Sequence, residues 1–430
     1  MLNVDEAYFV SGSIPPERRR ALRVWNAGFV VSTPQTFFND VLLPFSTVLR
    51  DARRAGDPIP LLEEAFRDAG FAFPYDIVVA DECQRYVGET DGYSILLSAK
   101  ASGARILALS ATPQLHAPAR LEELRRIFDR IEVFSVDDPE IRRYVPERVV
   151  VMVRVRVPDS LLAVYRQLGA VARRYEGRIR EAYGAGHLRR RCREHGLCVR
   201  LLSLNALRLR LVEDGASSVI GYRTWGLSDL RRPLEELGGR SVYEAYRQAL
   251  KERFNHKILA AMRILDRETY EKAIVFVESV KAAKQLGGML QRSHGMEDVA
   301  VLVGKGGMSM EQQASALLQF RERARILVCT SVGEEGLDIP AADMEIWLDP
   351  PSSPRKWIQR FGRILRQPGD KRRAVTHALI SMRTHERNKL LSVKRRTEEV
   401  YGFTQRLVVE SHRALPRGQR TMTRFLREAD

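Results

Sequence analysis

Asp81-Glu82-Cys83-Gln84 closes a short apolar run and brings two adjacent carboxylates to its end. One carboxylate in such a place can hold Mg²⁺, and a second beside it can orient or deprotonate water. Hydrolysis of a phosphoanhydride needs both roles. We therefore expect Asp81 to be the Mg²⁺ ligand and Glu82 the residue that activates water. A lone Asp-Glu pair is common, so this interpretation depends on the segments that accompany it.

Hydroxyl groups and glycines end two other apolar runs. Ser110 and Thr112 close one of them, where hydroxyls can link a nucleotide site to a neighbouring surface, although half-buried hydroxyls at strand ends are ordinary. The segment 330–340, Thr-Ser-Val-Gly-Glu-Glu-Gly-Leu-Asp-Ile-Pro, is more specific. Backbone groups near Gly336 can meet phosphate, and Asp338 can bond a ribose or an arginine. We expect these four residues to contact a nucleotide.

A third segment, Gln359-Arg-Phe-Gly-Arg-Ile-Leu-Arg366, places Gln359, Arg363 and Arg366 within two turns of a predicted helix. Arg363 and Arg366 are three positions apart and therefore share a face. Two arginines presented together suit a γ-phosphate that is reached from a second domain. Gly362 would weaken a helix that was merely structural, which favours the functional interpretation.

The elements that must hold these residues are predicted by hydrophobic pattern. Continuous apolar runs that end in small or acidic residues predict parallel strands buried on both faces, with the polar residues at their carboxyl ends. Such runs lie at 28–33, 75–82, 104–112, 272–279, 298–303, 324–331, 343–349 and 374–380. Helical stretches separate them, and Ser309 and Gln312 form a capping box before one helix. The fold class is therefore α/β, with one unit at 1–150 and a second at 258–400.

The segment 151–257 has a different pattern, with leucines and alanines at helical spacing, and it predicts a helical insertion. Residues 154–257 hold 22 Lys and Arg against 11 Asp and Glu, which is +11 of the chain's net charge of +16. This concentration favours a polyanion-binding element. Its sharpest part is the run Arg189, Arg190, Arg191 and Arg193, although such a run is more often a solvated face. Residues 401–430 are predicted to be a polar, basic and flexible tail.

Composition excludes several classes of protein. The chain is 44% hydrophobic and 29% charged, which is typical of folded domains and not of disordered or fibrous chains. Its pI near 9.9 favours a nucleic-acid partner. The four cysteines contain no C-x-x-C pair, so neither a disulfide framework nor a zinc site is expected. The first residues resemble no secretory signal and no apolar run could span a membrane, so we expect a cytoplasmic, nucleoid-associated protein.

Taken in order, these segments resemble the superfamily 2 helicases, most closely the helicase part of archaeal Hef and the FANCM-like translocases. The resemblance implies two RecA-like lobes, ATP with Mg²⁺ between them, and a helical insertion that grips forked or branched DNA. It assigns Thr33 and Gln35 in Thr33-Pro34-Gln35, together with Thr330 and Ser331, to DNA contact. The implied activity is an ATP-dependent DNA helicase or translocase in replication-fork repair. Related enzymes act on RNA, so RNA stays an alternative polymer.

One part of that family pattern is missing. A nucleotide motor needs a phosphate loop of the form G-x-x-x-x-G-K-[ST], and no lysine of this chain is followed by Ser or Thr. In the family, that loop and its central strand precede the segment that matches residues 8–25. We therefore expect an incomplete first lobe whose strands expose faces that should be buried. A partner polypeptide, a split or misplaced gene start, or a non-hydrolysing DNA-binding scaffold would each account for it.

The last residues contain a pattern of the form Q-x-x-[aliphatic]-x-x-F-[apolar], made by Gln419, Met422, Phe425 and Leu426. It resembles the peptide by which replication and repair proteins bind the PCNA sliding clamp. One helical turn would bring the three apolar side chains to one side as a hydrophobic plug. The alternative is that Phe425 and Leu426 pack back onto the second lobe.

Overall fold

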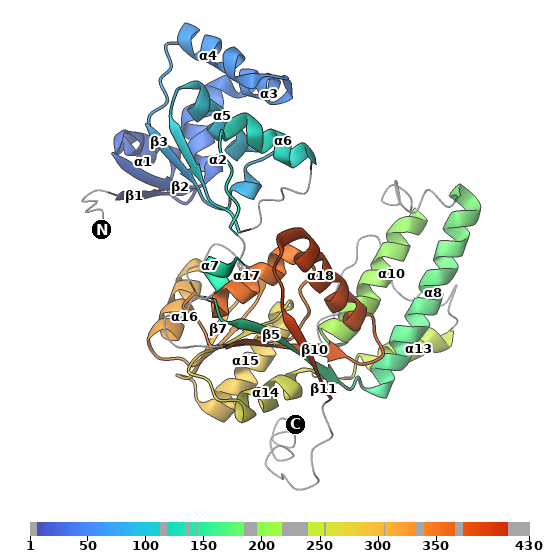
Figure 1. The fold of residues 1–430 in the computed structure, drawn as a ribbon. Helices are drawn as coiled ribbons and strands as arrows, with labels where there is room; N and C mark the ends of the chain where they lie inside the picture. Colours follow the sequence, from blue (N-terminus) through green and yellow to red (C-terminus); the bar gives the residue numbers. More distant parts are fainter. Residues whose placement is uncertain are drawn as a thin grey trace. The chain divides into compact units, whose positions relative to one another are not determined.

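The computed structural model describes residues 7–111, 118–134, 138–142, 145–184, 196–216, 240–252, 255–304, 306–331, 339–365 and 373–411. The chain divides into two compact units, Met1–Phe134 and Ser135–Asp430 (Figure 1). Each unit has buried cores of its own. Among the described residues, no helix has both the length and the hydropathy needed to cross a membrane.

The first unit alternates short strands with helices that begin at clear capping residues. Thr33 caps one helix and Asp57 another, and in each case a proline follows at the first helical position. Aromatic side chains dominate the core, with Phe37, Phe66 and Tyr93 all buried. The elements are β1 (Ala7–Val10), α1 (Pro16–Ala21), β2 (Phe29–Ser32), α2 (Pro34–Phe37), α3 (Ser46–Arg54), α4 (Pro58–Asp68), β3 (Ile77–Ala80), α5 (Asp91–Ala101), β4 (Arg105–Ala108) and α6 (Pro118–Ile127).

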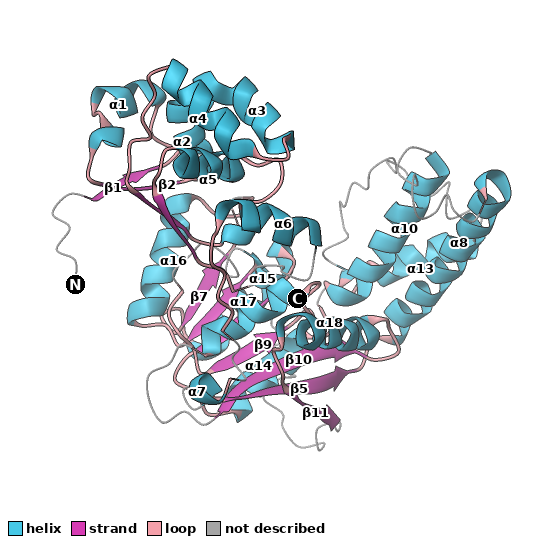
Figure 2. Cartoon of the chain, turned by 45° about the horizontal axis from the view of Figure 1, so that its top comes forward, coloured by secondary structure: helices cyan, strands magenta, loops and turns pink. Residues whose placement is uncertain are grey.

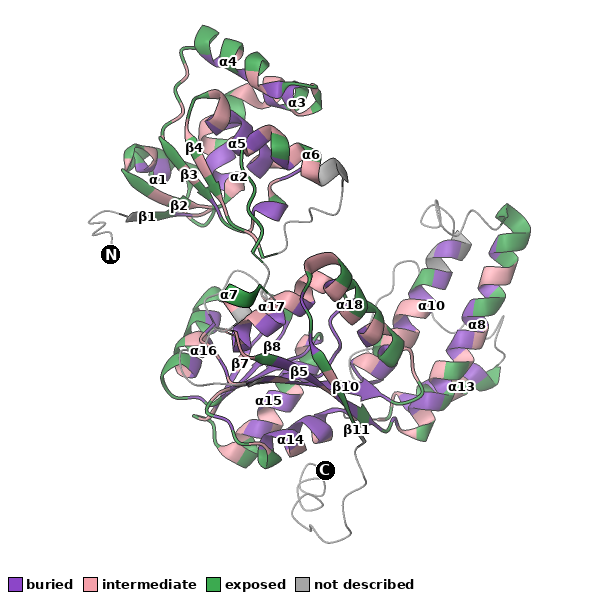
Figure 3. Ribbon diagram, viewed as in Figure 1, coloured by how far each residue is buried: buried purple, intermediate pink, exposed green. Residues whose placement is uncertain are grey.

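Within the described residues, the first unit contains two separate parallel pairs, β1 with β2 and β3 with β4. One face of these strands packs on the core, and the other is exposed to solvent. The exposed fractions are 62% for Ile77, 60% for Val79 and 54% for Leu107. Figure 3 shows β3 and β4 largely in green, the colour of exposed residues. Parallel sheets normally have both faces covered. These exposed fractions therefore confirm the expectation that strand faces of the first unit are uncovered.

The second unit is built on one larger sheet. In the part of the chain that the structure describes, its strand order is β11-β5-β10-β9-β6-β8-β7, and every pair is parallel. The elements are α7 (Pro139–Arg142), β5 (Glu147–Val155), α8 (Asp159–Tyr183), α10 (Gly196–Glu213), α13 (Arg240–Ala249), α14 (Ile258–Arg267), β6 (Ala273–Phe276), α15 (Val280–His294), β7 (Val299–Leu302), α16 (Met310–Glu322), β8 (Ile326–Cys329), β9 (Met344–Trp347), α17 (Pro354–Ile364), β10 (Arg373–Ser381), α18 (Glu386–Tyr401) and β11 (Arg406–Ser411).

Helices cover both faces of this sheet, as Figure 2 shows. On one face, α14 and α15 bury their apolar side chains against the strands. On the other face, α16, α17 and α18 pack around the tryptophans of β9 and α17, Trp347 and Trp357. The strands β6, β8 and β9 are buried along their whole length, which explains their continuous apolar sequences. The α/β fold with a parallel sheet is therefore confirmed.

A helical hairpin projects from the second unit between β5 and α14. Its long helices α8 and α10 pack side by side, and α13 packs against α8. Leu161, Leu168, Leu204 and Leu211 belong to a core that these helices form by themselves. This hairpin occupies the segment in which a helical insertion was predicted.

Two boundaries differ from those expected. Residues 147–155 form β5, which pairs with β10 and β11, so the first unit ends before residue 150 and the sheet of the second unit extends into the segment assigned to the insertion. The tail assigned to 401–430 is also too long, because Arg406–Ser411 forms β11 along β5. Both predicted boundaries are wrong because the second sheet takes strands from distant parts of the chain, which a local pattern does not indicate.

Candidate active site

The predicted catalytic carboxylates of the first unit lie where β3 ends. Asp81 is exposed and Glu82 is partly buried. The backbone N–H of Glu82 donates to Asp81 Oδ1 at 2.9 Å. Glu82 has a φ of 53°, a left-handed conformation that is uncommon for a residue with a side chain. This turn ends the strand and places both side chains at the carboxyl edge of β3 and β4, where parallel sheets form their sites.

The structure joins these carboxylates to the hydroxyl segment through Gln84. The Nε2 of Gln84 donates to Glu82 Oε2, and the hydroxyl of Ser110 donates to Gln84 Oε1 at 2.5 Å. Main-chain bonds beyond the strands hold the two segments in register, from Cys83 N to Leu109 O and from Leu109 N to Ala80 O. Gln84 is buried and was not among the predicted site residues. Its position two residues after Glu82 was the available signal.

Burial also explains the protonation state of the thiol of Cys83, which follows Glu82. Desolvation, followed by the charges of Glu82 and Asp81, raises the pKa of Cys83 to about 11. The thiol therefore stays protonated and unreactive near neutral pH, because the thiolate is the nucleophilic form. Cys83 packs in the core of the first unit and serves the site only as an apolar support for β3.

Thr33 and Gln35, which were predicted to contact DNA, lie at the start of α2 directly after β2. The Thr33 hydroxyl accepts a hydrogen bond from Thr36 N and lies 2.7 Å from the Thr36 hydroxyl. Both Thr33 and Gln35 are exposed, so either can reach a ligand in solvent. The start of a helix offers N–H groups to a phosphate, but four residues make α2 too short to constitute a site by itself.

In the second unit, Thr330 and Ser331 follow β8. Thr330 is buried, and its N–H donates to Leu302 O at 3.1 Å, whereas Ser331 is exposed. The two residues thus occupy the end of the strand as predicted, with only Ser331 facing solvent. Several other predicted residues lie outside the described residues: Thr112, Arg189, Arg190, Arg191, Arg193, Gly336, Asp338, Arg366, Gln419, Met422, Phe425 and Leu426.

The helix that carries Gln359 and Arg363 is α17. Ser353 caps its start and Pro354 occupies the first position. Gln359 is partly buried, and among the described residues its amide oxygen has no hydrogen-bond partner. Arg363 is 6% exposed. Both residues lie on a helix whose Trp357 and Phe361 are anchored in the core, which gives them a rigid base.

Sequence reasoning missed the residue that fixes this helix, Arg360. It is 1% exposed, and it donates to Glu278 Oε1 at 3.0 Å and to the carbonyl of Asp349 at 2.8 Å. Glu278 and Asp349 follow β6 and β9, so the carboxyl ends of two strands hold α17. Burial raises the pKa of Glu278, but the charges of Arg360 and Lys356 outweigh this effect and leave the pKa below the usual value.

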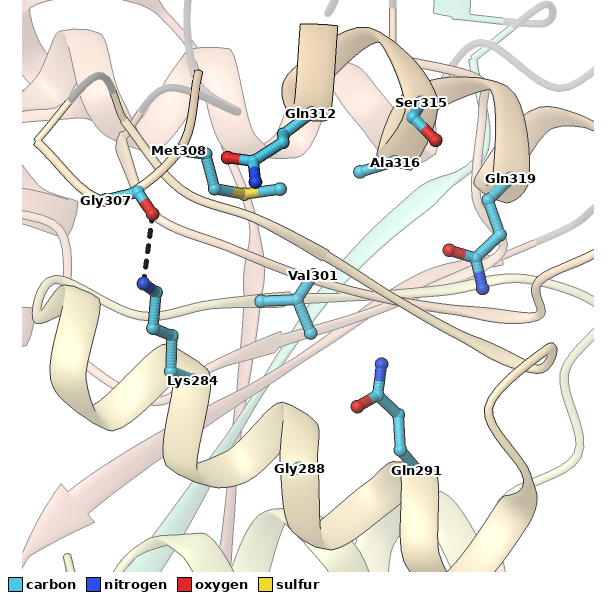
Figure 4. Close-up of a pocket in the computed structure, with 10 residues that line it drawn as sticks. All are labelled: Lys284, Gly288, Gln291, Val301, Gly307, Met308, Gln312, Ser315, Ala316 and Gln319. Carbon is cyan, nitrogen blue, oxygen red and sulfur yellow. Dashed lines mark hydrogen bonds between the residues drawn. The ribbon is translucent and has the colours of Figure 1, made fainter. Parts of the chain in front are cut away.

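A groove of about 490 Å³ lies elsewhere in the second unit, along β7. Figure 4 shows it lined by side chains of α15 and α16, among them Gln291 and Gln319. Lys284 donates to the carbonyl of Gly307 at 3.0 Å and thereby holds the loop that follows β7. None of the residues predicted from sequence to act on a nucleotide lines this groove.

Comparison with known proteins gives the second unit a family relationship. Residues 256–367 match the family model of the helicase conserved C-terminal domain. A putative ATP-dependent RNA helicase of Methanocaldococcus jannaschii is 23% identical over 408 residues, which cover 86% of this chain and 48% of that protein. A putative ATP-dependent RNA helicase of Caenorhabditis elegans is 39% identical over 104 residues, 24% of this chain. The chain thus spans at most about half the length of these relatives, 48% of the first and 20% of the second.

Among solved structures, the chain is similar in fold to the Hef helicase domain of Pyrococcus furiosus. The TM-score is 0.50 and the identity is 21%, with 90% of this chain and 82% of that chain covered. This similarity concerns the fold and does not extend to a substrate. The second unit therefore carries a match to the helicase conserved C-terminal domain at residues 256–367, and the chain as a whole is similar in fold to a helicase domain.

Proposed function

We propose that this chain is an ATP-dependent DNA helicase or translocase that acts on forked or branched DNA in replication-fork repair. The observation that carries the proposal is the hydrogen-bonded chain Glu82–Gln84–Ser110 at the carboxyl ends of β3 and β4. It joins a residue that can activate water to a hydroxyl on the next strand. A motor needs such a connection, because hydrolysis must be coupled to a change elsewhere in the protein.

The residues present fit the chemistry of ATP hydrolysis. Mg²⁺ in nucleotide sites is held by one or two carboxylates together with substrate phosphates and water, and the exposed Asp81 provides one such carboxylate. In the described part of the chain, no three His, Cys, Asp or Glu side chains form a group that could hold a metal ion. Asp81 would hold the metal together with phosphates of the nucleotide and water, and the metal would neutralise phosphate charge. In this proposal Glu82 orients water, and Gln359, Arg363 and Arg366 stabilise the transferring phosphoryl group.

We further propose that a polypeptide segment outside these 430 residues supplies the phosphate loop. The exposed apolar face of β3 and β4 supports this, because Ile77, Val79 and Leu107 need a cover that the described first unit does not provide. A strand that pairs along β4, followed by a loop and a helix, would bury this face and bring main-chain N–H groups to the carboxyl edge. The segment can belong to a partner polypeptide or to a longer form of this chain.

The polymer is proposed to be DNA, held by the basic helical hairpin. Charge supports a nucleic acid in general, since residues 154–257 carry +11 of the net +16. A second candidate, an RNA-directed helicase, is favoured by the names of the two relatives, which are both described as ATP-dependent RNA helicases. Recruitment of the PCNA sliding clamp through Gln419, Met422, Phe425 and Leu426 stays part of the proposal. Clamp recruitment by a non-hydrolysing scaffold is the alternative.

The test is ATP hydrolysis by the full chain, with and without a polypeptide that carries the phosphate loop. The product of the gene upstream is the first partner to try. Hydrolysis stimulated by forked DNA and abolished by Glu82→Gln is the expected result. Glu89→Gln is a matched control, because this carboxylate is exposed and, among the described residues, its ion pair is a surface contact with Arg54. Absence of turnover under every condition would favour the scaffold, and competition by duplex RNA over forked DNA would favour the RNA enzyme.

A further inference from the structure

Charged groups lie between the base of the helical hairpin and helix α17, and at their centre Lys257, Asp349 and Glu386 are fully buried. Lys257 precedes α14 and is fully buried, with 0% of its side chain exposed. Its Nζ contacts Glu386 Oε1 at 2.5 Å, Asp349 Oδ1 at 3.3 Å and the carbonyl of Leu348 at 2.9 Å. Burying a lysine is costly unless each of its protons is satisfied. Three acceptors on two different elements satisfy this one.

One arm of the network leads from Lys257 to α17. Asp349, whose carboxylate contacts Lys257, also accepts a hydrogen bond from the N–H of Glu278 at 2.9 Å and receives Arg360 on its carbonyl. Glu278 then binds Arg360 and Lys356, both at 3.0 Å. The orientation of α17 is thus set by the carboxylate of Glu278 and the main-chain carbonyl of Asp349. Lys257 contacts the side chain of Asp349 directly and reaches Glu278 through it.

The other arm leads to the hairpin. Glu386 starts α18, and on the same helix Lys389 donates to Glu213 of α10 at 2.8 Å. His385, the residue before Glu386, lies 2.9 Å from the same carboxylate, and its N–H donates to the hydroxyl of Tyr165 on α8 at 3.2 Å. The hairpin therefore contacts the start of α18 through charged and polar groups rather than through apolar packing alone.

A close backbone contact holds Lys257 beside the base of the hairpin. Gly215 has a φ of +83°, and a Cβ at this position would lie 2.9 Å from the Cα of Asn255. Any larger residue would push the two segments apart. Asn255 bridges them, because its Nδ2 donates to the carbonyl of Glu213 at 3.1 Å and its Oδ1 accepts from Lys257 N at 2.9 Å. The sequence thus brings the lysine to the hairpin through main-chain contacts as well as through charges.

We propose that Lys257 is a positioning residue that holds the helix bearing Gln359 and Arg363 in register with the base of the hairpin. The inference rests on the proposed function only for the role of α17 in hydrolysis. A displacement of about 1 Å at a catalytic group costs on the order of 100-fold in rate. A nucleic acid bound to the hairpin would thus be held at a fixed position relative to α17.

Hydrogen exchange of the full chain tests the network without any need for turnover. Lys257→Met should raise exchange both in residues 354–364 of α17 and in the ends of α10 and α18. Two matched variants each remove one arm: Lys389→Met should raise exchange only at the hairpin base, and Glu278→Gln only in α17. Unchanged exchange of α17 in Lys257→Met would overturn the proposal, because the lysine would then support the hairpin alone.

Lys257→Met leaves two buried carboxylates without their cation and can fail to fold, so Asp349→Asn provides a second route. It is isosteric, and it should raise the exchange of α17 while the hairpin keeps its protection; equal exchange with wild type would contradict the inference. With the phosphate loop supplied, Asp349→Asn should lower kcat about 10- to 100-fold with the KM for ATP unchanged. An inactive wild-type protein would refute the proposed function, whereas the exchange result would still decide the positioning role.

Discussion

Acid should destabilise the second unit through His256, and the size of the effect follows from the position of this residue. His256 Nε2 lies 2.8 Å from the Ser381 hydroxyl, and among the described residues its buried Nδ1 has no hydrogen-bond partner. Burial, followed by the positive charge of Lys257, lowers the pKa of His256 from 6.5 to about 3. The folded protein therefore keeps this imidazole neutral, while the unfolded chain protonates it below about pH 6.5.

The sign of the effect follows from proton linkage. A lowered pKa contributes stability that is fully present above pH 6.5 and is lost as the pH falls towards 3. With these two values, the loss at pH 5 is about 2 kcal/mol. Replacing His256 with Gln removes the titration and retains a donor for Ser381. The pH-dependent loss of unfolding free energy between pH 7.5 and pH 5 should therefore be smaller in His256→Gln by about 2 kcal/mol.

Urea unfolding at both pH values, followed by tryptophan fluorescence, measures this difference. Trp347 and Trp357 lie in the core of the second unit and report on its unfolding. Other acidic groups titrate in the same range, but wild type and variant share them, so the comparison isolates His256. If both proteins lose equal free energy on acidification, His256 does not titrate as its burial implies, and the reasoning is refuted.

Three further predictions concern the proposed function. Once a phosphate loop is supplied, Arg363→Ala should lower ATP turnover by about several hundred-fold or more and leave DNA affinity nearly unchanged in a filter-binding assay; parallel loss of DNA binding would contradict the assignment. Neutralising the four arginines of the segment 189–193 should weaken DNA binding and flatten its salt dependence by about one log–log unit per lost phosphate contact; an unchanged slope would make the run a solvated face. A peptide of residues 416–430 should bind the sliding clamp in calorimetry better than its Met422→Ala/Phe425→Ala variant, and equal binding would exclude this interaction.

The strands could be predicted from sequence, and so could the positions of the polar residues that follow them, because both signals are local. A buried parallel strand is a short continuous apolar run, and the residue that follows it lies at the functional edge of the sheet. This logic placed Glu82 and Ser110 each at the carboxyl end of a strand, and the structure joins them through Gln84. The exposed strand faces of the first unit were also predictable, because this sequence lacks the phosphate loop and the central strand that bears it in such a sheet.

Contacts between distant segments could not be predicted in this way. Lys257 and Glu386 are 129 positions apart, and neither stands in a pattern that indicates its partner. Strand β11 was missed for a related reason. It pairs only with β5 at the edge of the sheet, so its sequence mixes Arg406 and Glu410 with aliphatic residues and lacks the apolar continuity of a central strand.

The place of β5 in the sheet has a mechanical consequence. This strand pairs with β10 on one side and β11 on the other, and its chain continues through Pro158 directly into α8. A force that is applied at the start of α8 and directed along the axis of β5 acts parallel to the strand. It therefore loads many ladder hydrogen bonds in shear at the same time, instead of opening them one after another from an end. We expect single-molecule pulling on α8 to meet high resistance, with rupture of β5 from both neighbours in one event.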